Sequence, residues 1–245
     1  MGSNTYISVS GATARFRDLD VVSNNLANIG TAGFKRGESI FRAVFEASLR
    51  GAEGRLQTGA PASAFVATDL VGTDFGRGSA DRTGSPLHAM IDGPGFFEVE
   101  TERGLRYTRA GNFQVNREGE LATAMGDPVL GDGGVIAVPD GDARIEPTGD
   151  VIDRNGNLLG RLQVVEFENL QGLEKEGLGL FRAGEELEPL PVERPLLIPE
   201  SIEGSNVEGA RELATLVILQ RAFETNLQAM QTDDETTRRL IEGIR

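Results

Sequence analysis

The sequence predicts an α+β fold in which N- and C-terminal α-helices pair as a coiled-coil-like inner domain around a central, mostly antiparallel β-domain. Apolar residues recur every seven positions near each terminus, which predicts the two helices. The 32 glycines are scattered among short runs of β-forming residues, which predicts the strands. We expect a terminal helical domain of residues 1–36 and 205–245, an extended connector of 37–84 and 183–204, and a β-domain of 85–182.

The first helix is predicted over roughly the first thirty residues. One apolar row contains Val9, Phe16 and Ser23, and the neighbouring row contains Ala12, Leu19 and Leu26. Asn28 and Gly30 tolerate left-handed backbone, and Gly33 follows, so the helix should end here and the chain should turn. Phe34 is then in a position to anchor the turn.

The second helix is predicted from about residue 205 to the C-terminus. Its rows contain Leu213, Gln220, Leu227, Asp234 and Ile241, and Leu216, Phe223, Met230, Thr237 and Ile244. Asn206 is the predicted N-cap, and Glu208 and Glu212 suit the positive end of the helix dipole. Polar residues within such rows weaken a coiled coil but fix its register or its partner.

A single helix that covers a globular core is the commoner cause of this spacing. Here the two patterns lie at opposite ends of the chain, with residues 37–204 of different composition between them. We therefore expect each helix to be covered by the other helix or by another subunit. A single chain would cover both apolar rows poorly, so we expect the termini to be mobile before assembly and to order against neighbouring subunits.

The middle of the chain divides into a connector and a region of short strands. Residues 37–80 lack strong periodicity, which indicates an irregular or weakly stranded connector. The strands are separated by turn residues, and Glu118-Gly119 and Asn155-Gly156 are predicted hairpin turns. Residues 184–204 are rich in Pro and Glu and are predicted to be an extended return to the last helix.

The net charge of −14 is unevenly distributed. Residues 1–36 carry four basic and two acidic residues, a balance of +2, and residues 205–245 carry five basic and seven acidic residues, a balance of −2. The whole excess therefore lies in residues 37–204, which argues against nucleic-acid binding. It indicates either an ordinary solvated acidic surface or a chain whose near-neutral ends pack together in many copies while the acidic middles stay apart.

No residue pattern points to catalysis or to a cofactor. The sequence contains no cysteine and one histidine, His88. The usual set of zinc ligands therefore cannot be assembled, and no recognisable partner residues complete a catalytic triad with His88. Carboxylate pairs are expected by chance among 38 acidic residues, and none is distinguished from the others. We expect no enzyme activity, no catalytic, metal or cofactor-binding residues, and no membrane insertion, because no apolar run approaches the roughly 18 residues of a membrane helix.

One segment resembles the opening of a calcium-binding loop. Asp153, Asn155 and Asn157 match its opening, but Leu158 and Val164 occupy the positions of the required glycine and glutamate. The Asn155-Gly156 hairpin explains the same residues.

Two terminal motifs carry a resemblance to a known family. The segment SGATARFRDLDVVSNNLANIGTAGFKR at residues 10–36 resembles the N-terminal signature of the flagellar basal-body rod and hook family, N-N-L-A-N followed by T-x-G-F-[KR]. The matching residues are Asn24, Asn25, Leu26, Ala27, Asn28, Thr31, Gly33, Phe34 and Lys35. The C-terminal block is similar through S-N-V and Q-R-A-[FY]-E, and its assembly helix is represented by Ser205, Asn206, Val207, Leu213, Leu216, Gln220, Phe223, Leu227 and Met230. Between them, DGPGFF and YTRAGNF are similar to the central block of the family.

The resemblance implies a structural subunit that polymerises helically into the rod crossing the periplasm. It implies export through the flagellar type III apparatus without a cleaved signal, pairing of the terminal helices in an inner tube, and a β-domain held outward. The implied partners are copies of the chain and the adjacent proximal and distal rod proteins. The length and the segment GGVIAVPDGDARIEPTGDVID are most similar to a proximal-rod member.

Three alternatives remain at this point. They are a distal-rod or hook paralogue, a monomeric β-domain binding protein with a helical stalk, and an acidic-cleft hydrolase. The first five residues differ from the usual opening of the family, so their contacts are not carried over.

Overall fold

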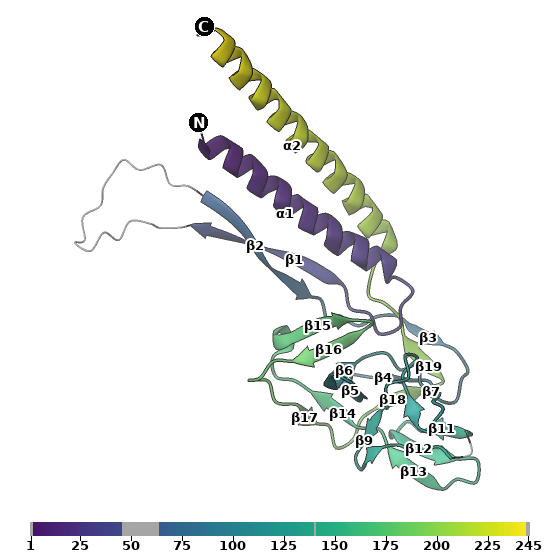
Figure 1. Ribbon diagram of the computed structural model, residues 1–245. Helices are drawn as coiled ribbons and strands as arrows, with labels where there is room; N and C mark the ends of the chain where they lie inside the picture. The colour runs from purple at the N-terminus through teal and green to yellow at the C-terminus, as the bar shows by residue number, and fades with distance from the viewer. Residues whose placement is uncertain (1, 46–63, 140, 244–245) are drawn as a thin grey trace, which may run out of the picture. The chain divides into compact units, whose positions relative to one another are not determined.

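The computed structural model describes residues 2–45, 64–139 and 141–243 (Figure 1). The chain divides into two compact units. The helical unit consists of residues 1–26, 37–72 and 208–245, and the β unit consists of residues 27–36 and 73–207.

The helical unit contains the two terminal helices and a strand pair. Helix α1, Gly2–Ala27, contacts helix α2, Gly209–Gly243, as Figure 1 shows, which confirms the predicted pairing of the chain ends. Strands β1, Gly37–Phe45, and β2, Ala64–Thr73, form a two-stranded sheet. Among the described residues, no helix is long and apolar enough to cross a membrane.

Strands β1 and β2 lie within residues 37–84, the predicted extended connector, and are longer than the sequence indicated. These strands have nine and ten residues, whereas the sequence was expected to be irregular or weakly stranded there. Both strands are rich in β-branched and aromatic residues, in SIFRAVF and AFVATDLVGT. Strand propensity of this kind does not require the alternating pattern on which the prediction relied.

Helix α1 buries a row other than the predicted ones. Asp18, Val22 and Asn25 are buried at a spacing that places them on one face. Phe16 is 57% exposed, and Leu19 and Leu26 are half-buried. The side chains of Val9 and Ala12 lie outside the described part of the chain.

Helix α2 also buries a face other than the predicted apolar rows. Glu212 and Leu219 are buried, whereas Leu213 is 51% and Leu227 is 41% exposed. Phe223 is half-buried. The side chains of Met230, Asp234, Thr237 and Ile241, and the whole of Ile244, lie outside the described residues.

The β unit is built on a six-stranded antiparallel sheet. Its strand order is β15-β16-β6-β5-β14-β17. The bounds are β5 Phe96–Thr101, β6 Gly104–Thr108, β14 Val164–Glu166, β15 Leu173–Gly177, β16 Leu180–Ala183 and β17 Leu190–Pro191. A short 3₁₀ turn, Leu170–Gly172, precedes β15.

Smaller antiparallel sheets complete the β unit. Strands β11 Ala143–Ile145, β12 Asp150–Asp153 and β13 Leu158–Arg161 form a three-stranded sheet. The pairs are β3 Ala80–Arg82 with β19 Ser201–Glu203, β4 Ala89–Ile91 with β18 Leu197–Pro199, β7 Gln114–Val115 with β8 Leu121–Ala122, and β9 Leu130–Gly131 with β10 Gly134–Val135. The predicted antiparallel β-region is therefore confirmed.

Two hydrophobic clusters lie in this unit. Consecutive residues of a strand point to opposite faces, so Phe96 and Phe97 enter different clusters. The Phe97 ring contacts Phe113 with centroids 4.9 Å apart, and Phe96 packs against Phe167 at 5.9 Å.

Both predicted hairpin turns are present. Gly119 and Gly156 have φ of +80° and +84°, a left-handed backbone that glycine adopts readily. The Asp153 carboxylate accepts hydrogen bonds from the backbone N–H groups of Asn155 and Asn157 at 2.7 and 2.8 Å. These bonds lie within the hairpin, as its turn interpretation predicts, and the described residues contain no cluster of three His, Cys, Asp or Glu side chains that could hold a metal ion.

Candidate functional site

Three segments far apart in the sequence meet at a buried ion triad in the β unit. Lys35 follows the end of α1, Arg109 follows β6, and Glu203 ends β19. The Lys35 Nζ lies 2.6 Å from Glu203 Oε1, and the Arg109 Nε lies 3.0 Å from Glu203 Oε2. Their exposed fractions are 1%, 6% and 0%, so the three charges are almost completely removed from water. We call Lys35, Arg109, Glu203 and the backbone segments joined around them the junction.

Backbone groups make further hydrogen bonds to Lys35 Nζ and to Glu203 Oε1. Glu203 Oε1 also accepts from the backbone N–H of Gly78 at 2.9 Å, and Lys35 Nζ donates to the Gly76 carbonyl at 2.8 Å. Charge-assisted bonds of this kind are stronger than neutral ones. A buried ion pair of this geometry is costly to break from one side, because the remaining charge loses its partner in a site that excludes water.

Arg109 is the best-connected member of the triad. Its guanidinium donates to the Gly95 carbonyl at 2.7 Å and to the Gly93 carbonyl at 2.8 Å, and it lies 5.8 Å from the centroid of the Phe96 ring. The planar guanidinium thus fixes the loop that leads into β5 as well as Glu203.

Burial and pairing act in opposite directions on the charges of the triad. Burial lowers the pKa of Lys35, although the hydrogen bond and the charge of Glu203 oppose this shift. Burial also lowers the pKa of Arg109. Burial alone would raise the pKa of Glu203, but the charge of Arg109, the Gly78 N–H and Lys35 outweigh it, so the pKa of Glu203 is lowered.

Backbone hydrogen bonds join residues 33–36 to residues 203–206. The Gly33 N–H donates to the Glu203 carbonyl at 2.7 Å, and the Asn206 N–H donates to the Phe34 carbonyl at 3.4 Å. The Arg36 N–H donates to the Asn206 side-chain oxygen at 2.7 Å. These hydrogen bonds therefore hold the segment that follows α1 against the segment that precedes α2.

The N-cap prediction for Asn206 was wrong. Helix α2 begins at Gly209, and the Asn206 amide donates instead to the carbonyls of Asp74 at 2.9 Å and Gly76 at 3.1 Å. Its side chain thus joins residues 36 and 74–76, a long-range role that a local capping signal cannot reveal. Glu212 lies in the first turn of α2, as predicted.

Gly33 permits the close approach of two backbones at the junction. Its φ is +68°, and an added Cβ would lie 2.3 Å from the Ala110 nitrogen and 2.5 Å from the Arg109 carbonyl carbon. Real Cβ atoms essentially never approach other atoms so closely. Both the conformation and the packing at this position therefore require glycine.

Phe34 and Lys175 connect the junction to strand β15. The Phe34 side chain is buried, and the Lys175 Nζ lies 3.6 Å from its ring centroid, which is a cation–π contact. The Lys175 Nζ also donates to the Lys35 carbonyl. Burial lowers the pKa of Lys175 to about 8.

The asparagines of the N-terminal motif have different roles. Asn25 is buried in the helical unit, where its side chain accepts from the Gly37 N–H at 2.8 Å and donates to the Gly37 carbonyl at 2.9 Å. Asn28 accepts from the Thr31 hydroxyl at 3.2 Å and from the Thr31 N–H through its carbonyl at 3.1 Å. Asn25 therefore fixes the start of β1, and Asn28 forms the turn after α1. Asn24 is exposed.

The remaining motif residues are divided between the two units. Leu26 is half-buried and Ala27 is the exposed last residue of α1. The Ser205 hydroxyl accepts from the N–H of Val207, whose side chain is buried. The predicted residues of α2 are mostly exposed or half-buried: Leu213, Leu216, Gln220, Phe223 and Leu227.

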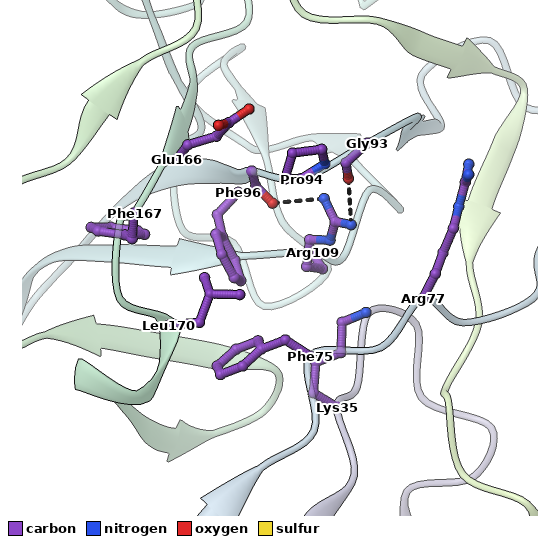
Figure 2. A pocket seen from close by; sticks show the side chains of 11 residues that line it. Lys35, Phe75, Arg77, Gly93, Pro94, Phe96, Arg109, Glu166, Phe167 and Leu170 are labelled. Carbon is purple, nitrogen blue, oxygen red and sulfur yellow. Dashed lines mark hydrogen bonds between the residues drawn. The ribbon is translucent and has the colours of Figure 1, made fainter.

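A cavity of about 300 Å³ adjoins the junction (Figure 2). We call it the aromatic cavity. It is lined by Lys35, Phe75, Arg77, Gly93, Pro94, Gly95, Phe96, Arg109, Glu166, Phe167 and Leu170.

Sequence reasoning did not identify Arg109, Glu203 or Lys175 as members of the site. Arg109 lies in YTRAGNF and Glu203 lies two residues before the S-N-V motif, so each was close to a quoted block. The pairing of Lys35 with Glu203, 168 residues apart, leaves no local pattern in the chain.

Three comparisons with family descriptions cover both ends and the middle of the chain. The description "Flagella basal body rod protein" matches residues 6–35, "Flagellar hook protein FlgE/F/G D1 domain" matches residues 90–160, and "Flagellar basal body rod FlgEFG protein C-terminal" matches residues 198–242.

Similarity to individual proteins extends over the whole chain. The flagellar basal-body rod protein FlgF of Caulobacter vibrioides is 31% identical over 249 residues, which cover 100% of this chain and 98% of that protein. The FlgG proteins of Buchnera aphidicola subsp. Schizaphis graminum and of Bacillus subtilis are each 30% identical, with 96% of this chain and 97% of each relative covered. The chain belongs to the flagellar basal-body rod protein family.

The buried triad of this rod protein draws one residue from each matched block. Lys35 lies in the N-terminal block, Arg109 in the D1 block and Glu203 in the C-terminal block. The rod protein is a structural member of the basal body and not an enzyme. In this chain the buried charges of the triad fix the course of the backbone where the three blocks meet.

Proposed function

We propose that the chain is a proximal-rod subunit that corresponds to FlgF and polymerises helically with other rod subunits. The proposal is supported by full-length similarity to a FlgF protein. FlgG relatives are similarly close, so a distal-rod subunit is the alternative. We also propose that the chain is located in the rod that crosses the periplasm. We further propose that it is exported through the flagellar type III apparatus.

The observation that carries the proposal is the exposed apolar surface of the two helices. Phe16 is 57% exposed on α1, and Leu213, Val217 and Ile218 are 51%, 47% and 66% exposed on α2. Burying such surface stabilises a structure by roughly 25 cal/mol per Å². This stabilisation is realised when neighbouring subunits arrive, so ordering of the chain ends is coupled to growth of the rod.

The motif residues have a defined part in this proposal. The predicted assembly residues of α2 present apolar side chains to neighbours, and those of residues 24–35 fix how the chain leaves α1 and enters the β unit. The three-part division of the chain into a helical assembly domain, a connector and an outward β-domain is also part of the proposal. Head-to-tail packing of such subunits, repeated without closure, produces an open helical rod.

A cysteine cross-link in cells tests the proposal, because the chain contains no cysteine of its own. Ile218→Cys introduces a thiol on the exposed face of α2, and Ile218→Ser is the matched variant without a thiol. We expect a reagent with a maleimide at one end and a photo-reactive group at the other to capture rod-family subunits with the cysteine variant and none with the serine variant. The captured neighbours, identified by mass, distinguish a proximal from a distal position. Capture of no rod-family subunit from motile cells would contradict the proposal.

A further inference from the structure

A hollow of about 210 Å³ lies in the β unit beside the turn that joins β15 to β16. Its lining comes from the turn after α1, from the end of β6 and the segment after it, from the segment that follows β8, and from residues 178 and 180. We call it the Leu178 hollow. A cavity of about 150 Å³ is large enough to hold benzene, so this hollow has room for one branched aliphatic side chain.

The rim of the Leu178 hollow is apolar and exposed. Met125 and Leu178 both line the hollow, and they are 65% and 68% exposed. Ile29, which follows the lining residue Asn28 in the chain, is 44% exposed. Large exposed apolar side chains grouped at a hollow are typical of an interaction site.

Leu178 occupies a backbone position that disfavours leucine. Leu178 and Gly179 form the two-residue loop between Gly177 and Leu180, and their φ angles are +53° and +76°. Hairpin loops with this backbone favour Asn-Gly, because a Cβ is strained in the left-handed region and asparagine tolerates it best. The leucine therefore costs the single chain stability while most of its side chain remains in water. Its apolar surface is buried only when another surface covers it.

The exposed face of α2 has the chemistry that suits this hollow. Val217 and Ile218 are branched aliphatic residues, and they are 47% and 66% exposed. Arg221 is also exposed. It follows Val217 by four residues and Ile218 by three, so the three side chains are neighbours on one face of the helix.

Opposite charges lie at the hollow and on this helix face. Asp127 is the one charged residue of the lining, and its half-buried carboxylate accepts a hydrogen bond from the Thr123 hydroxyl at 3.5 Å. Within the part of the chain that the structure describes, neither Asp127 nor Arg221 forms an ion pair. Each therefore gains an oppositely charged partner when α2 of another copy reaches the hollow.

We infer that the Leu178 hollow receives Ile218 and Arg221 from α2 of a second copy of the chain. Ile218 enters the apolar rim, and Arg221 pairs with Asp127. The two surfaces belong to different units of the chain, so the contact is head-to-tail, which is the kind of contact that an open helical rod requires. The inference rests on the proposed function and names the surface that covers α2 in the rod.

Disulfide trapping between two copies tests the contact. Cells produce one full-length copy with Leu178→Cys and another with Ile218→Cys, and their basal bodies are oxidised mildly. Leu158→Cys replaces Leu178→Cys in the matched control, because Leu158 is 62% exposed in the same unit but does not line the hollow. A disulfide joins only residues whose Cα atoms lie within about 7 Å, so we expect at least about tenfold more covalent dimer with Leu178→Cys than with Leu158→Cys. Equal yields would overturn the inference.

A charge swap tests the ion pair. Asp127→Lys in the Leu178→Cys copy should lower the dimer yield about threefold, because it replaces a partly exposed ion pair with repulsion. Arg221→Glu in the Ile218→Cys copy should then restore the yield. Asp127→Asn removes the charge with little change of shape, so it should also lower the yield. An unchanged yield from both Asp127 variants, or a swap that restores nothing, would show that Asp127 and Arg221 do not meet and would overturn the inference.

The photo-reactive reagent on Ile218→Cys separates this inference from the proposed function. We expect the captured peptide to come from the segments that line the Leu178 hollow in a second copy of the chain. Capture of another part of this chain, or of a different rod-family subunit alone, overturns the inference and leaves the proposed function standing. Capture of no rod-family subunit contradicts both.

Discussion

Replacement of Gly33 by alanine should destabilise the β unit strongly. The left-handed backbone of Gly33, at φ +68°, costs a residue with a Cβ about 1–2 kcal/mol. The new Cβ would lie 2.3 Å from the Ala110 nitrogen, and relief of such a clash between backbones costs about 1–3 kcal/mol more. We therefore expect the free energy of unfolding to fall by about 2–5 kcal/mol, a large part of the stability of a domain.

Two glycine controls separate strain from close packing. Gly84 has φ +74° but no atom within 4 Å of an added Cβ, so Gly84→Ala should cost only the conformational part, about 1–2 kcal/mol. Gly30 has no neighbour within 4 Å and no left-handed φ, so Gly30→Ala should change stability by less than about 1 kcal/mol.

Urea unfolding of the full chain measures these three changes. The chain has two tyrosines and no tryptophan, so in a Tyr6→Phe background the fluorescence of Tyr107 reports the β unit alone. If Gly33→Ala and Gly84→Ala unfold with the same free energy, the backbone approach at the junction is not what requires glycine, and the reasoning is refuted.

Three further predictions concern the charges of the junction and the helix surface. Glu203→Gln leaves two buried cations without their carboxylate and should cost about 3–5 kcal/mol in urea unfolding; a loss below about 1 kcal/mol would contradict the role of the triad. The pKa of Lys175 is lowered to about 8, below its usual value of about 10.4, so the unfolded chain binds more protons between these pH values. Stability should therefore rise with pH across this window, and Lys175→Met should remove that rise; an unchanged slope would rule out Lys175 as its source. Ile218→Glu should leave the unfolding of the purified chain nearly unchanged, because the side chain is 66% exposed, yet abolish rod assembly in a motility assay; normal swimming would show that this face has no partner.

The local features of the fold were predictable because they are encoded within short windows. Seven-residue periodicity predicted both terminal helices. Glycine-containing turn sequences predicted the hairpins at Gly119 and Gly156. The strands β1 and β2 were missed because their residues favour strands through β-branched and aromatic side chains without a regular alternation.

The buried face of each helix could not be obtained from apolar periodicity. Asp18 and Glu212 are buried although both are acidic, so a pattern of apolar residues passes over them. The predicted apolar row of α2 includes Leu213 and Leu227. Both side chains are exposed in the single chain. Apolar periodicity identifies the apolar face of a helix, but it does not identify the partner that covers that face.

The junction depends on contacts that sequence spacing does not report. Gly33 and Phe34 were recognised as turn and anchor residues, because their local motif implies a turn. Their partners, Ala110 just after β6 and Lys175 in β15, are distant in the sequence and are brought close only by the folded β unit. Long-range pairing of this kind becomes visible only in the structure.

The central claim is that neighbouring subunits cover the apolar faces that a single chain leaves exposed on α1 and α2. The most direct measurement is the rate of maleimide labelling of Ile218→Cys in the purified chain and in isolated basal bodies. Labelling should be fast in the purified chain and slower by about tenfold or more in basal bodies, since burial of that face excludes the reagent. Equal labelling rates in the two preparations would contradict the account.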